Sequence, residues 1–335
     1  MSASAEPSAE LSERARQGDP EAQFELGGLV RKGASGSPSN LPAAMQWYFK
    51  AASQNHVGAQ LALGNLLLDD LSSIGVKRNP SQAVRWLEKA AQTGEVSAQY
   101  RLAMLLLKGD GVERNAEEGM RWLLLATEAG HSDARFEASC RYALGTDVAT
   151  DSARSLQLLI AGVEQEHVPS LNHIAMLIQN GAWLDRDETL AARIYQYAFF
   201  KLNSLDAADS LGIAYSKGIG FVADHDQALQ LFEYAVYAGR NESMYSVGLL
   251  RLSAPAVKDL VEAVKWGALS VQYCPEGNGQ KLLGVLGGLC TAQQLEEGRA
   301  RAANWKRVPR GMTVLTQGEL VNPLAGRKFT IERNE

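Results

Sequence analysis

Apolar residues recur at helical spacing between Ala98 and Gly130, in two successive stretches. Residues three and four positions apart lie on one face of a helix, so the pattern predicts two short amphipathic helices joined by a tight loop. Neither helix can bury its apolar stripe alone, and the unit therefore needs neighbours. The first stripe is Ala98, Leu102, Leu105 and Leu106, and the second is Met120, Trp122, Leu123 and Ala126.

The ends of these two helices are also marked in the sequence. Lys108 and Gly109 close the first helix, because glycine readily takes the left-handed conformation of a helix end. Asn115 precedes the second helix and offers a side-chain acceptor to its first backbone N–H groups. Glu118, three residues later, is expected to reach back to the backbone N–H of Asn115, as in a capping box. Gly130 ends the second helix.

The same pair of helices returns along the chain with a nearly constant period. The capping residues before the second helices are separated by 39, 36, 36, 36, 37 and 35 residues: Asn40, Asn79, Asn115, Asp151, Asp187, Asp224 and Asp259. A large residue stands seven positions after each cap: Trp47, Trp86, Trp122, Leu158, Ile194, Leu231 and Trp266. A small residue opens each first helix: Ala22, Ala59, Ala98, Ala134, Ser170, Ala207 and Ser243. Three positions in phase over seven units predict an all-α solenoid of helix pairs.

This register divides the chain into four parts. Residues 1–19 form a polar N-terminus and a capping helix, and residues 20–277 form the seven repeats. Residues 278–308 are expected to form C-terminal capping helices that shield the last repeat from water. For the tail, 309–335, a flexible segment and a short hairpin both stay open. The seventh repeat has Ser253, Ala254 and Pro255 in place of the loop glycines, so its turn must differ.

The motif of the repeats resembles the Sel1-like repeat (SLR) family, which is related to the tetratricopeptide repeat. The stretches Gln-Leu-Ala-Leu-Gly at 60–64 and Gly-Asp-Gly-Val at 109–112 are good local matches, and the likeness extends over residues 20–305. The resemblance implies a right-handed superhelical solenoid of about seven helix-turn-helix repeats. It also implies a protein–protein interaction scaffold, of the kind that serves as a bacterial adaptor, assembly factor or regulator.

By resemblance to tetratricopeptide repeats, inward-facing residues lie two, six and nine positions after each small opener. The first row is Phe24, Leu61, Tyr100, Phe136, Asn172, Asp209 and Tyr245, and the second row is Gly28, Asn65, Met104, Cys140, Met176, Ile213 and Leu249. The third row is Arg31, Leu68, Leu107, Ala143, Gln179, Ser216 and Leu252. Apolar solvent-facing rows suit an amphipathic helix or an extended peptide. The candidate partner-binding residues are Phe24, Leu61, Tyr100, Met104, Phe136, Met176, Tyr245 and Leu249. Two interpretations stay open: an open groove, or side chains packed against neighbouring first helices.

Composition and charge narrow the possible surroundings and partners. The net charge is −5, which does not favour a general polyanion binder. Three cysteines without close spacing are typical of a reducing compartment, and the first residues lack the basic and apolar regions of a secretory signal. No apolar run approaches the roughly 20 residues that span a bilayer. We therefore expect a cytoplasmic protein without a membrane span, and the sequence leaves its oligomeric state open.

The titratable residues predict neither an enzyme nor a metal or cofactor site. His56, His131 and His167 stand at boundaries between repeats, so we interpret them as structural junction residues. Asp185, Asp187 and Glu188 share one loop, which a cap and a solvated turn explain. Phosphate-loop, dinucleotide-binding and nucleophile-elbow motifs are missing from the sequence.

Two alternatives compete with the scaffold. Cysteine-rich members of the SLR family have been described as binding or hydrolysing β-lactams, but they pair cysteines within each repeat, and this chain has three cysteines. The end of the chain is locally basic, which raises a nucleic-acid-associated function. Its excess of positive charge is +3, too small for a strong phosphate-neutralising surface: Arg299, Arg301, Lys306, Arg307, Arg310, Arg327, Lys328 and Arg333 stand against Glu296, Glu297, Glu319, Glu332 and Glu335.

Overall fold

The computed structural model describes residues 9–33, 40–69, 77–307 and 323–324. Every regular element in these residues is a helix, as the sequence predicts. The chain divides into two compact units, residues 1–158 (unit 1) and 159–335 (unit 2), and the division falls within α9 (Ser152–Glu164). Residues 1–8 of the expected polar N-terminus lie outside the described residues.

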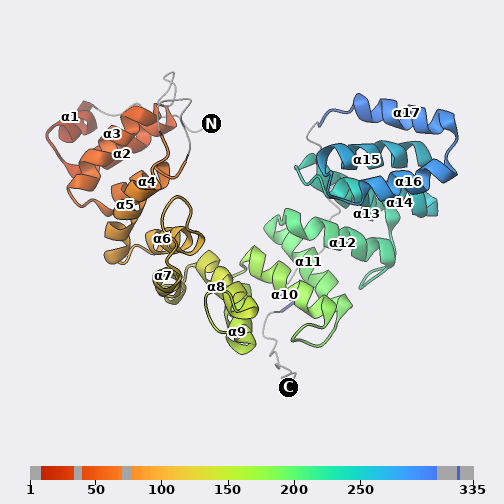
Figure 1. The fold of residues 1–335 in the computed structure, drawn as a ribbon, viewed down its shortest axis with the longest axis horizontal. Helices are drawn as coiled ribbons and strands as arrows, with labels where there is room; N and C mark the ends of the chain where they lie inside the picture. Colours follow the sequence, from red (N-terminus) through yellow and green to blue (C-terminus); the bar gives the residue numbers. More distant parts are fainter. Residues whose placement is uncertain (1–8, 34–39, 70–76, 308–322, 325–335) are drawn as a thin grey trace. The chain divides into compact units, whose positions relative to one another are not determined.

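Unit 1 consists of a short N-terminal helix followed by stacked helix pairs (Figure 1). In each pair the first helix packs against the second, and the second packs against the first helix of the next pair. The helices are α1 (Ala9–Arg16), α2 (Pro20–Lys32), α3 (Leu41–Ser53), α4 (Val57–Leu66), α5 (Pro80–Gln92), α6 (Val96–Lys108), α7 (Ala116–Glu128) and α8 (Ser132–Leu144).

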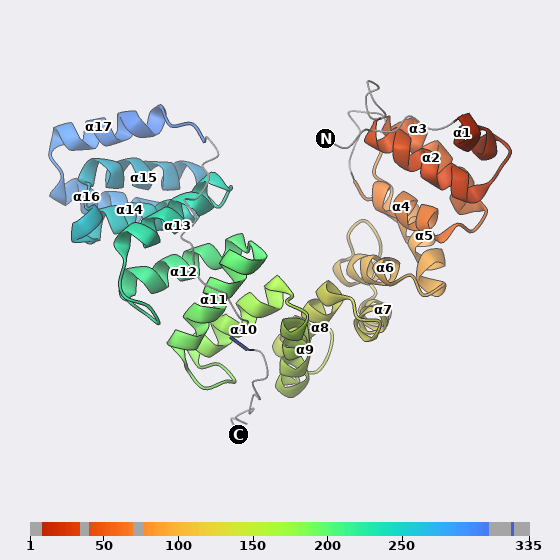
Figure 2. The ribbon, with the colours of Figure 1, turned by 180° about the vertical axis from the view of Figure 1, so that it is seen from behind.

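Unit 2 repeats this arrangement and ends in two helices that both pack on α15. Figure 2 shows α17 alongside α15 at the end of the stack, and the two helices are in extensive contact. The helices are α10 (Val168–Asn180), α11 (Glu188–Leu202), α12 (Leu205–Lys217), α13 (His225–Tyr237), α14 (Ser243–Ser253), α15 (Leu260–Tyr273), α16 (Gly279–Leu289) and α17 (Ala292–Ala303). The predicted change of turn in the seventh repeat is a 3-10 helix, η2 (Pro255–Val257).

All seven predicted Asn and Asp caps are confirmed. The side-chain oxygen of each accepts the backbone N–H three residues later, at 2.8 to 3.1 Å. The predicted capping box at Asn115 is wrong in one respect. The Glu118 carboxylate accepts from the side-chain amide of Asn115, at 3.0 Å, because the backbone N–H of Asn115 already donates to the carbonyl of Leu106. A complete capping box forms instead at Thr291 and Gln294.

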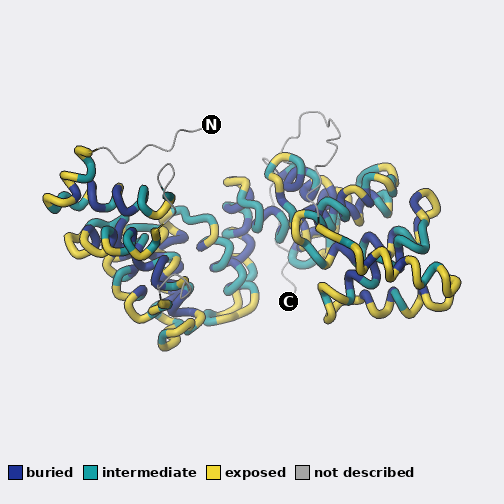
Figure 3. Tube along the Cα trace, turned by 90° about the horizontal axis from the view of Figure 1, so that it is seen from above, coloured by how far each residue is buried: buried dark blue, intermediate teal, exposed yellow. Residues whose placement is uncertain are grey.

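The core of each unit lies between the two helices of a pair and between neighbouring pairs. The seven small openers are all fully buried, at 0% exposure. Their size allows the helices to approach closely, and Gly64 shows how tight the approach is. A Cβ atom at Gly64 would lie 2.7 Å from Cγ of Leu87, itself fully buried. Figure 3 shows the same division within each unit, with buried residues between helices and exposed residues on their outer sides.

The C-terminal end of the stack differs in detail from the prediction. The last helix, α17, ends at Ala303 and is shorter than the expected segment that extends to residue 308. Trp305 therefore follows the helix and meets Trp266 edge-on, with ring centroids 6.0 Å apart. The expectations for the tail, 309–335, fall outside the described residues except at Pro323 and Leu324, where Leu324 is buried.

Candidate functional site

The first row of predicted groove residues forms contacts between repeats. In unit 1, Phe24 stacks on His56 with ring centroids 4.6 Å apart, and Tyr100 stacks on His131 at 4.5 Å. Each histidine precedes the first helix of the following repeat. Leu61 packs against the core cluster that contains Leu102. These side chains are half-buried, and part of each therefore joins one repeat to the next.

In unit 2 the same row makes polar contacts at the same place. The side-chain amide of Asn172 donates to Oγ of Ser204, the N-cap of α12, at 3.0 Å. Asp209 accepts from Oγ of Ser243, at 2.9 Å, and from the guanidinium of Arg240, at 3.3 Å. The first row thus serves the stacking of first helices in both units, by aromatic stacking in one and by hydrogen bonds in the other.

Two of the three junction histidines, His56 and His131, cap a helix with their side chains. Nδ1 of His56 accepts the backbone N–H of Ala59 at 3.1 Å, and Nδ1 of His131 accepts that of Ala134 at 3.3 Å. A nitrogen that accepts carries no proton, so the ring is in the neutral tautomer that keeps its proton on Nε2. In His56, Nε2 lies 3.0 Å from the carboxylate of Glu21 in the preceding repeat. This supports the interpretation of these residues as structural.

The third junction histidine and two of the acidic loop residues contact neighbouring protein groups. Nδ1 of His167 lies 2.9 Å from Oγ of Ser170. Asp187 caps α11, and Arg186 pairs with Glu188 in the same loop. Among the described residues, we find no group of three or more His, Cys, Asp or Glu side chains placed to hold a metal ion.

The three cysteines are unpaired and half-buried. Burial raises the pKa of the thiols of Cys140, Cys274 and Cys290 above the ordinary value. A thiol with a raised pKa stays protonated near neutral pH, and the thiolate is the reactive form. The surroundings of these cysteines therefore do not activate them as nucleophiles.

The second row is more open than the first, and it opens most in unit 2. Met176 is 41% exposed, Ile213 36% and Leu249 41%, although all three are large and apolar. In unit 1, Met104 is half-buried. Three first helices of unit 2 thus each expose an apolar side chain, at the positions where the sequence places a groove.

Part of the first-helix face of unit 2 is hollowed into a pocket of about 450 Å³ between α12 and α14. This volume falls within the range of ligand-binding clefts. Tyr245 and Leu249 from the predicted set meet Ile213 there, together with Phe232 of α13. The full lining is Ile213, Ser216, Lys217, His225, Phe232, Tyr245, Ser246, Leu249, Leu250, Ser253, Ala254 and Pro255.

Polar groups at this α12–α14 pocket are hydroxyls and cations. Oγ of Ser216 donates to the carbonyl of Ile213 at 2.9 Å, and Oγ of Ser253 donates to that of Leu249 at 2.8 Å. Each hydroxyl keeps lone pairs for an incoming N–H donor. Lys217 lines the pocket as well, and no Asp or Glu does. The pocket can therefore take an apolar side chain and hydrogen-bond the backbone beside it.

The structure places the eight predicted partner-binding residues in two groups. Five belong to unit 1 and three to unit 2, and of these only Tyr245 and Leu249 line a common described pocket. The unit 1 residues are Phe24, Leu61, Tyr100, Met104 and Phe136, and the unit 2 residues are Met176, Tyr245 and Leu249. Sequence reasoning missed the contribution of Phe232 and of the turn after α14, because both come from outside the first helices.

These repeated helix pairs define the class of protein as an α-solenoid. The family model for the Sel1 repeat matches residues 20–56, 57–94, 96–131, 168–199 and 205–239, more than half of the chain. The chain therefore belongs to the Sel1 repeat family, as the sequence resemblance indicated. Members of this family commonly act as protein-interaction scaffolds, and the fold is typically non-enzymatic.

Solved structures support the same assignment. A Sel1 repeat protein from Oxalobacter formigenes is 31% identical, with a TM-score of 0.65, over 72% of this chain and 68% of that chain. A protective antigen of uropathogenic Escherichia coli, c5321, which displays an SLR fold, is 24% identical with a TM-score of 0.71. The match covers 88% of this chain but 63% of the antigen, so this chain spans less than two thirds of its length. No protein of curated function matches the sequence.

Proposed function

We propose that this protein is a protein–protein interaction scaffold, a bacterial adaptor that serves in assembly or regulation and works in the cytoplasm without catalysing a reaction. Its ligand is a segment of a partner protein that lies along the first-helix face of unit 2 and inserts an apolar side chain into the α12–α14 pocket. The observation that carries this proposal is the gathering of Ile213, Tyr245 and Leu249 around one apolar hollow. Exposed apolar side chains grouped on a surface are typical of an interaction site.

Within the described residues every helix is too short or too polar to cross a bilayer. The polar rim of the pocket favours a peptide over a purely apolar ligand. Ser246 and the serines at 216 and 253 stand beside the apolar residues and can bond a peptide backbone. Lys217 gives the rim a positive charge, which favours an acidic residue next to the inserted side chain.

The test is a double variant, Ile213→Glu with Leu249→Glu. Both positions are more than a third exposed, so the fold should stay intact, with a cost of about 0.5 kcal/mol or less at each site. Binding of a partner identified by affinity capture and mass spectrometry should fall at least about tenfold, because the pocket would bury an unpaired charge.

Val222→Glu is the matched control, since Val222 is an exposed apolar residue of unit 2, at 89% exposure, outside the pocket. Its binding should equal that of the unchanged protein in direct titration calorimetry. A double variant that melts normally and binds its partner unchanged would refute the proposed groove. Turnover of a small-molecule substrate that survives purification and depends on point-mutable polar residues would refute the scaffold function.

A further inference from the structure

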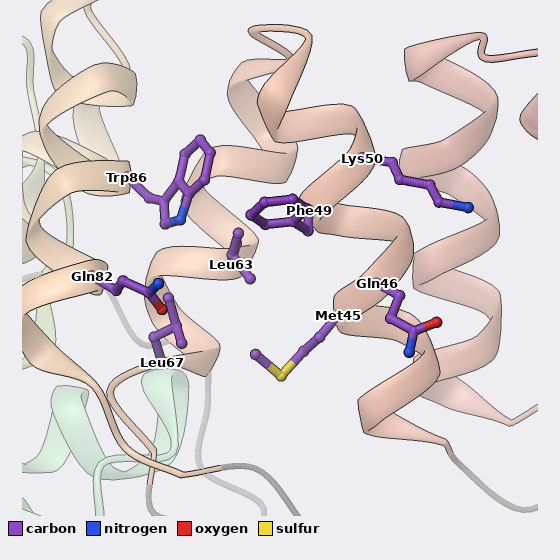
Figure 4. Close-up of a pocket in the computed structure, with 8 residues that line it drawn as sticks. All are labelled: Met45, Gln46, Phe49, Lys50, Leu63, Leu67, Gln82 and Trp86. Atoms are coloured by element: carbon purple, nitrogen blue, oxygen red, sulfur yellow. The ribbon is translucent and has the colours of Figure 1, made fainter.

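The second helices of unit 1 enclose a separate apolar hollow. Its volume is about 390 Å³, and its walls come from α3 and α5 (Figure 4). Phe49 is 53% exposed and meets Trp86 edge-on, with ring centroids 5.9 Å apart. Leu63 of α4 and Leu67, the residue just after this helix, lie between the two walls and are buried. We call this site the α3–α5 hollow.

The register of the repeats does not require an aromatic residue at Phe49. It stands nine positions after the cap Asn40, and the corresponding residue of the second repeat, nine positions after Asn79, is Glu88. The family fold therefore accepts a charged residue at this position. A half-exposed phenylalanine there costs solubility without stabilising the core, which indicates a role in binding.

Two lysines without a carboxylate partner among the described residues lie near the hollow: Lys50 lines it, and Lys89 comes one helical turn after Trp86, which lines it. Nζ of Lys50 lies 4.3 Å from the centroid of the Trp47 ring, and Nζ of Lys89 lies 4.8 Å from that of Trp86. Neither lysine forms an ion pair with any described residue. The helix α3 contains no acidic residue at all.

Other repeats of this chain show what is missing. In the third repeat, Arg121 lies over Trp122 and pairs with Glu118 at 3.5 Å. In the seventh, Lys265 lies over the neighbouring tryptophan and pairs with Glu262 at 2.9 Å. Both glutamates stand three residues after their caps. In those repeats the cation on the indole is neutralised within the same helix.

The first and second repeats have no carboxylate at that position. Ala43 and Gln82 stand three residues after their caps, where the third and seventh repeats have glutamate. The one acidic residue of α5 is Glu88, whose pKa is raised by burial and then by the carboxylate of Glu118 in α7. Lys50 and Lys89 stand ten residues after their caps, whereas Arg121 and Lys265 stand six residues after theirs. No described carboxylate neutralises Lys50 or Lys89, so their charges are available to an external partner.

From this geometry we propose that the α3–α5 hollow binds an acidic segment of a partner protein that carries one large apolar side chain. The apolar side chain enters the hollow beside the contact between Phe49 and Trp86, against Met45, Leu63 and Leu67. Carboxylates close to it pair with Lys50 and Lys89. A second copy of this chain does not fit. A two-fold contact through the hollow would place these lysines against themselves, and like charges at an interface are strongly unfavourable.

The experiment screens a displayed library of random dodecapeptides for binding to the full chain. Peptides that also bind the Phe49→Glu variant are removed by counter-selection. This substitution gives the first repeat the residue that the second already has, so the fold should persist, as far-UV circular dichroism and thermal melting can verify. We expect enriched peptides to combine a large apolar residue with Asp or Glu close to it. Labelled copies of these peptides then serve as the probe in fluorescence anisotropy.

Three variants separate the contribution of the hollow to peptide binding from that of the two lysines. Phe49→Glu should weaken binding of the selected peptide at least about tenfold, because it places a charge in the hollow. Lys50→Glu with Lys89→Glu should weaken the acidic peptide and strengthen a version of it with lysines in place of the acids. Leu144→Glu is the matched control: Leu144 is an exposed apolar residue of unit 1, at 77% exposure, outside the hollow, and its binding should change less than about twofold.

The affinity should also fall between about 50 and 500 mM salt, since solvent-exposed charge pairs are screened. The proposal is overturned if no enriched peptide depends on Phe49, or if the dependent peptides are basic instead of acidic. It is also overturned if the peptides lose binding in the Ile213→Glu, Leu249→Glu variant and not in Phe49→Glu. That last result would leave the proposed function of the α12–α14 pocket intact, so the two proposals can fail separately.

Discussion

The two units differ in how far they bury the side chain at one position of the repeat. Seven residues after each cap, unit 1 has half-buried residues, namely three tryptophans and Leu158, whereas unit 2 has large residues that are at most 1% exposed. The half-buried tryptophans are Trp47, Trp86 and Trp122, and the buried residues are Ile194, Leu231 and Trp266. The caps before them are equivalent, so the difference does not come from the helices themselves.

The difference in burial comes from the parts of the chain that pack against this position. Trp266 is covered because α17 packs on α15, and Trp305, just after α17, meets its ring edge-on. Trp86 instead meets Phe49 edge-on, and both side chains line the α3–α5 hollow. In unit 2, Trp266 on a second helix is therefore covered, and the pocket lies on the first helices. In unit 1 the pocket lies on the second helices. A solenoid built from one repeat can thus present different binding faces in its two parts.

The largest expected effect comes from truncating the two tryptophans. Trp266→Ala should lower the free energy of unfolding by about 3–5 kcal/mol, because it empties a fully buried site. Trp86→Ala should cost only about 1–2 kcal/mol, because its half-exposed ring buries less apolar area. Urea denaturation followed by far-UV circular dichroism measures both. Equal losses in the two variants would contradict the comparison.

A smaller loss of unfolding free energy should follow from overpacking between the two helices of a pair. It should be the same in both units, because both contain such pairs. A Cβ atom at Gly64 would lie 2.7 Å from Cγ of Leu87, and one at Gly212 would lie 2.6 Å from Cε1 of Phe232. We expect Gly64→Ala and Gly212→Ala each to cost about 1–3 kcal/mol in the same denaturation assay. A Cβ atom at the exposed Gly284 of α16 would meet nothing within 4 Å, so Gly284→Ala should instead stabilise the protein by about 0.5–1 kcal/mol. A cost in one unit alone would show that the helix pairs are packed differently.

The smallest expected loss of stability comes from Glu262, whose carboxylate joins α15 to α17. Burial acts to raise the pKa of Glu262, but hydrogen bonds from Lys265 and Arg301 outweigh it, so the pKa lies below its ordinary value of 4.5. A lowered pKa in the folded state means that the stability is present above the ordinary value and is lost as the pH falls through the lowered one. Glu262→Gln should therefore cost about 1 kcal/mol at neutral pH, and the difference from the unchanged protein should vanish in acid.

Thermal melting as a function of pH measures this loss. Glu118→Gln is the matched substitution in unit 1, since Glu118 also stands three residues after its cap and pairs with a cation beside a tryptophan, but it is more exposed. It should cost less than Glu262→Gln, because solvent screens an exposed pair. A larger cost in unit 1 would break the comparison.

The local features of the fold could be predicted from the sequence because they depend on neighbours along the chain. A cap such as Asn115 bonds a backbone N–H three residues away, and Gly109 takes the left-handed conformation at a helix end. The one local error, the capping box at Asn115, arose because its N–H donates to Leu106 in the preceding helix. That bond closes the loop between two helices, and helical spacing does not reveal it.

The candidate sites were predicted only in part. Repeat position placed Tyr245 and Leu249 on one face of α14, because it determines the direction in which a helical side chain points, and both residues line the α12–α14 pocket. It did not reveal that Tyr100 stacks on His131, or that Phe49 meets Trp86 edge-on beside a hollow. The sequence did carry a signal for Phe49, since the equivalent residue of the next repeat is Glu88.

The sequence by itself thus determined the register: where helices begin and end, and which side of each helix points inward. These properties follow from hydrogen bonds and side-chain spacing within a few residues. Only the tertiary structure decided which of the inward and outward positions are covered. Trp86 and Trp266 occupy the same place in their repeats, yet one is half-exposed and the other is buried. Burial depends on the side chains that adjacent helices bring to a position, and these come from distant parts of the chain.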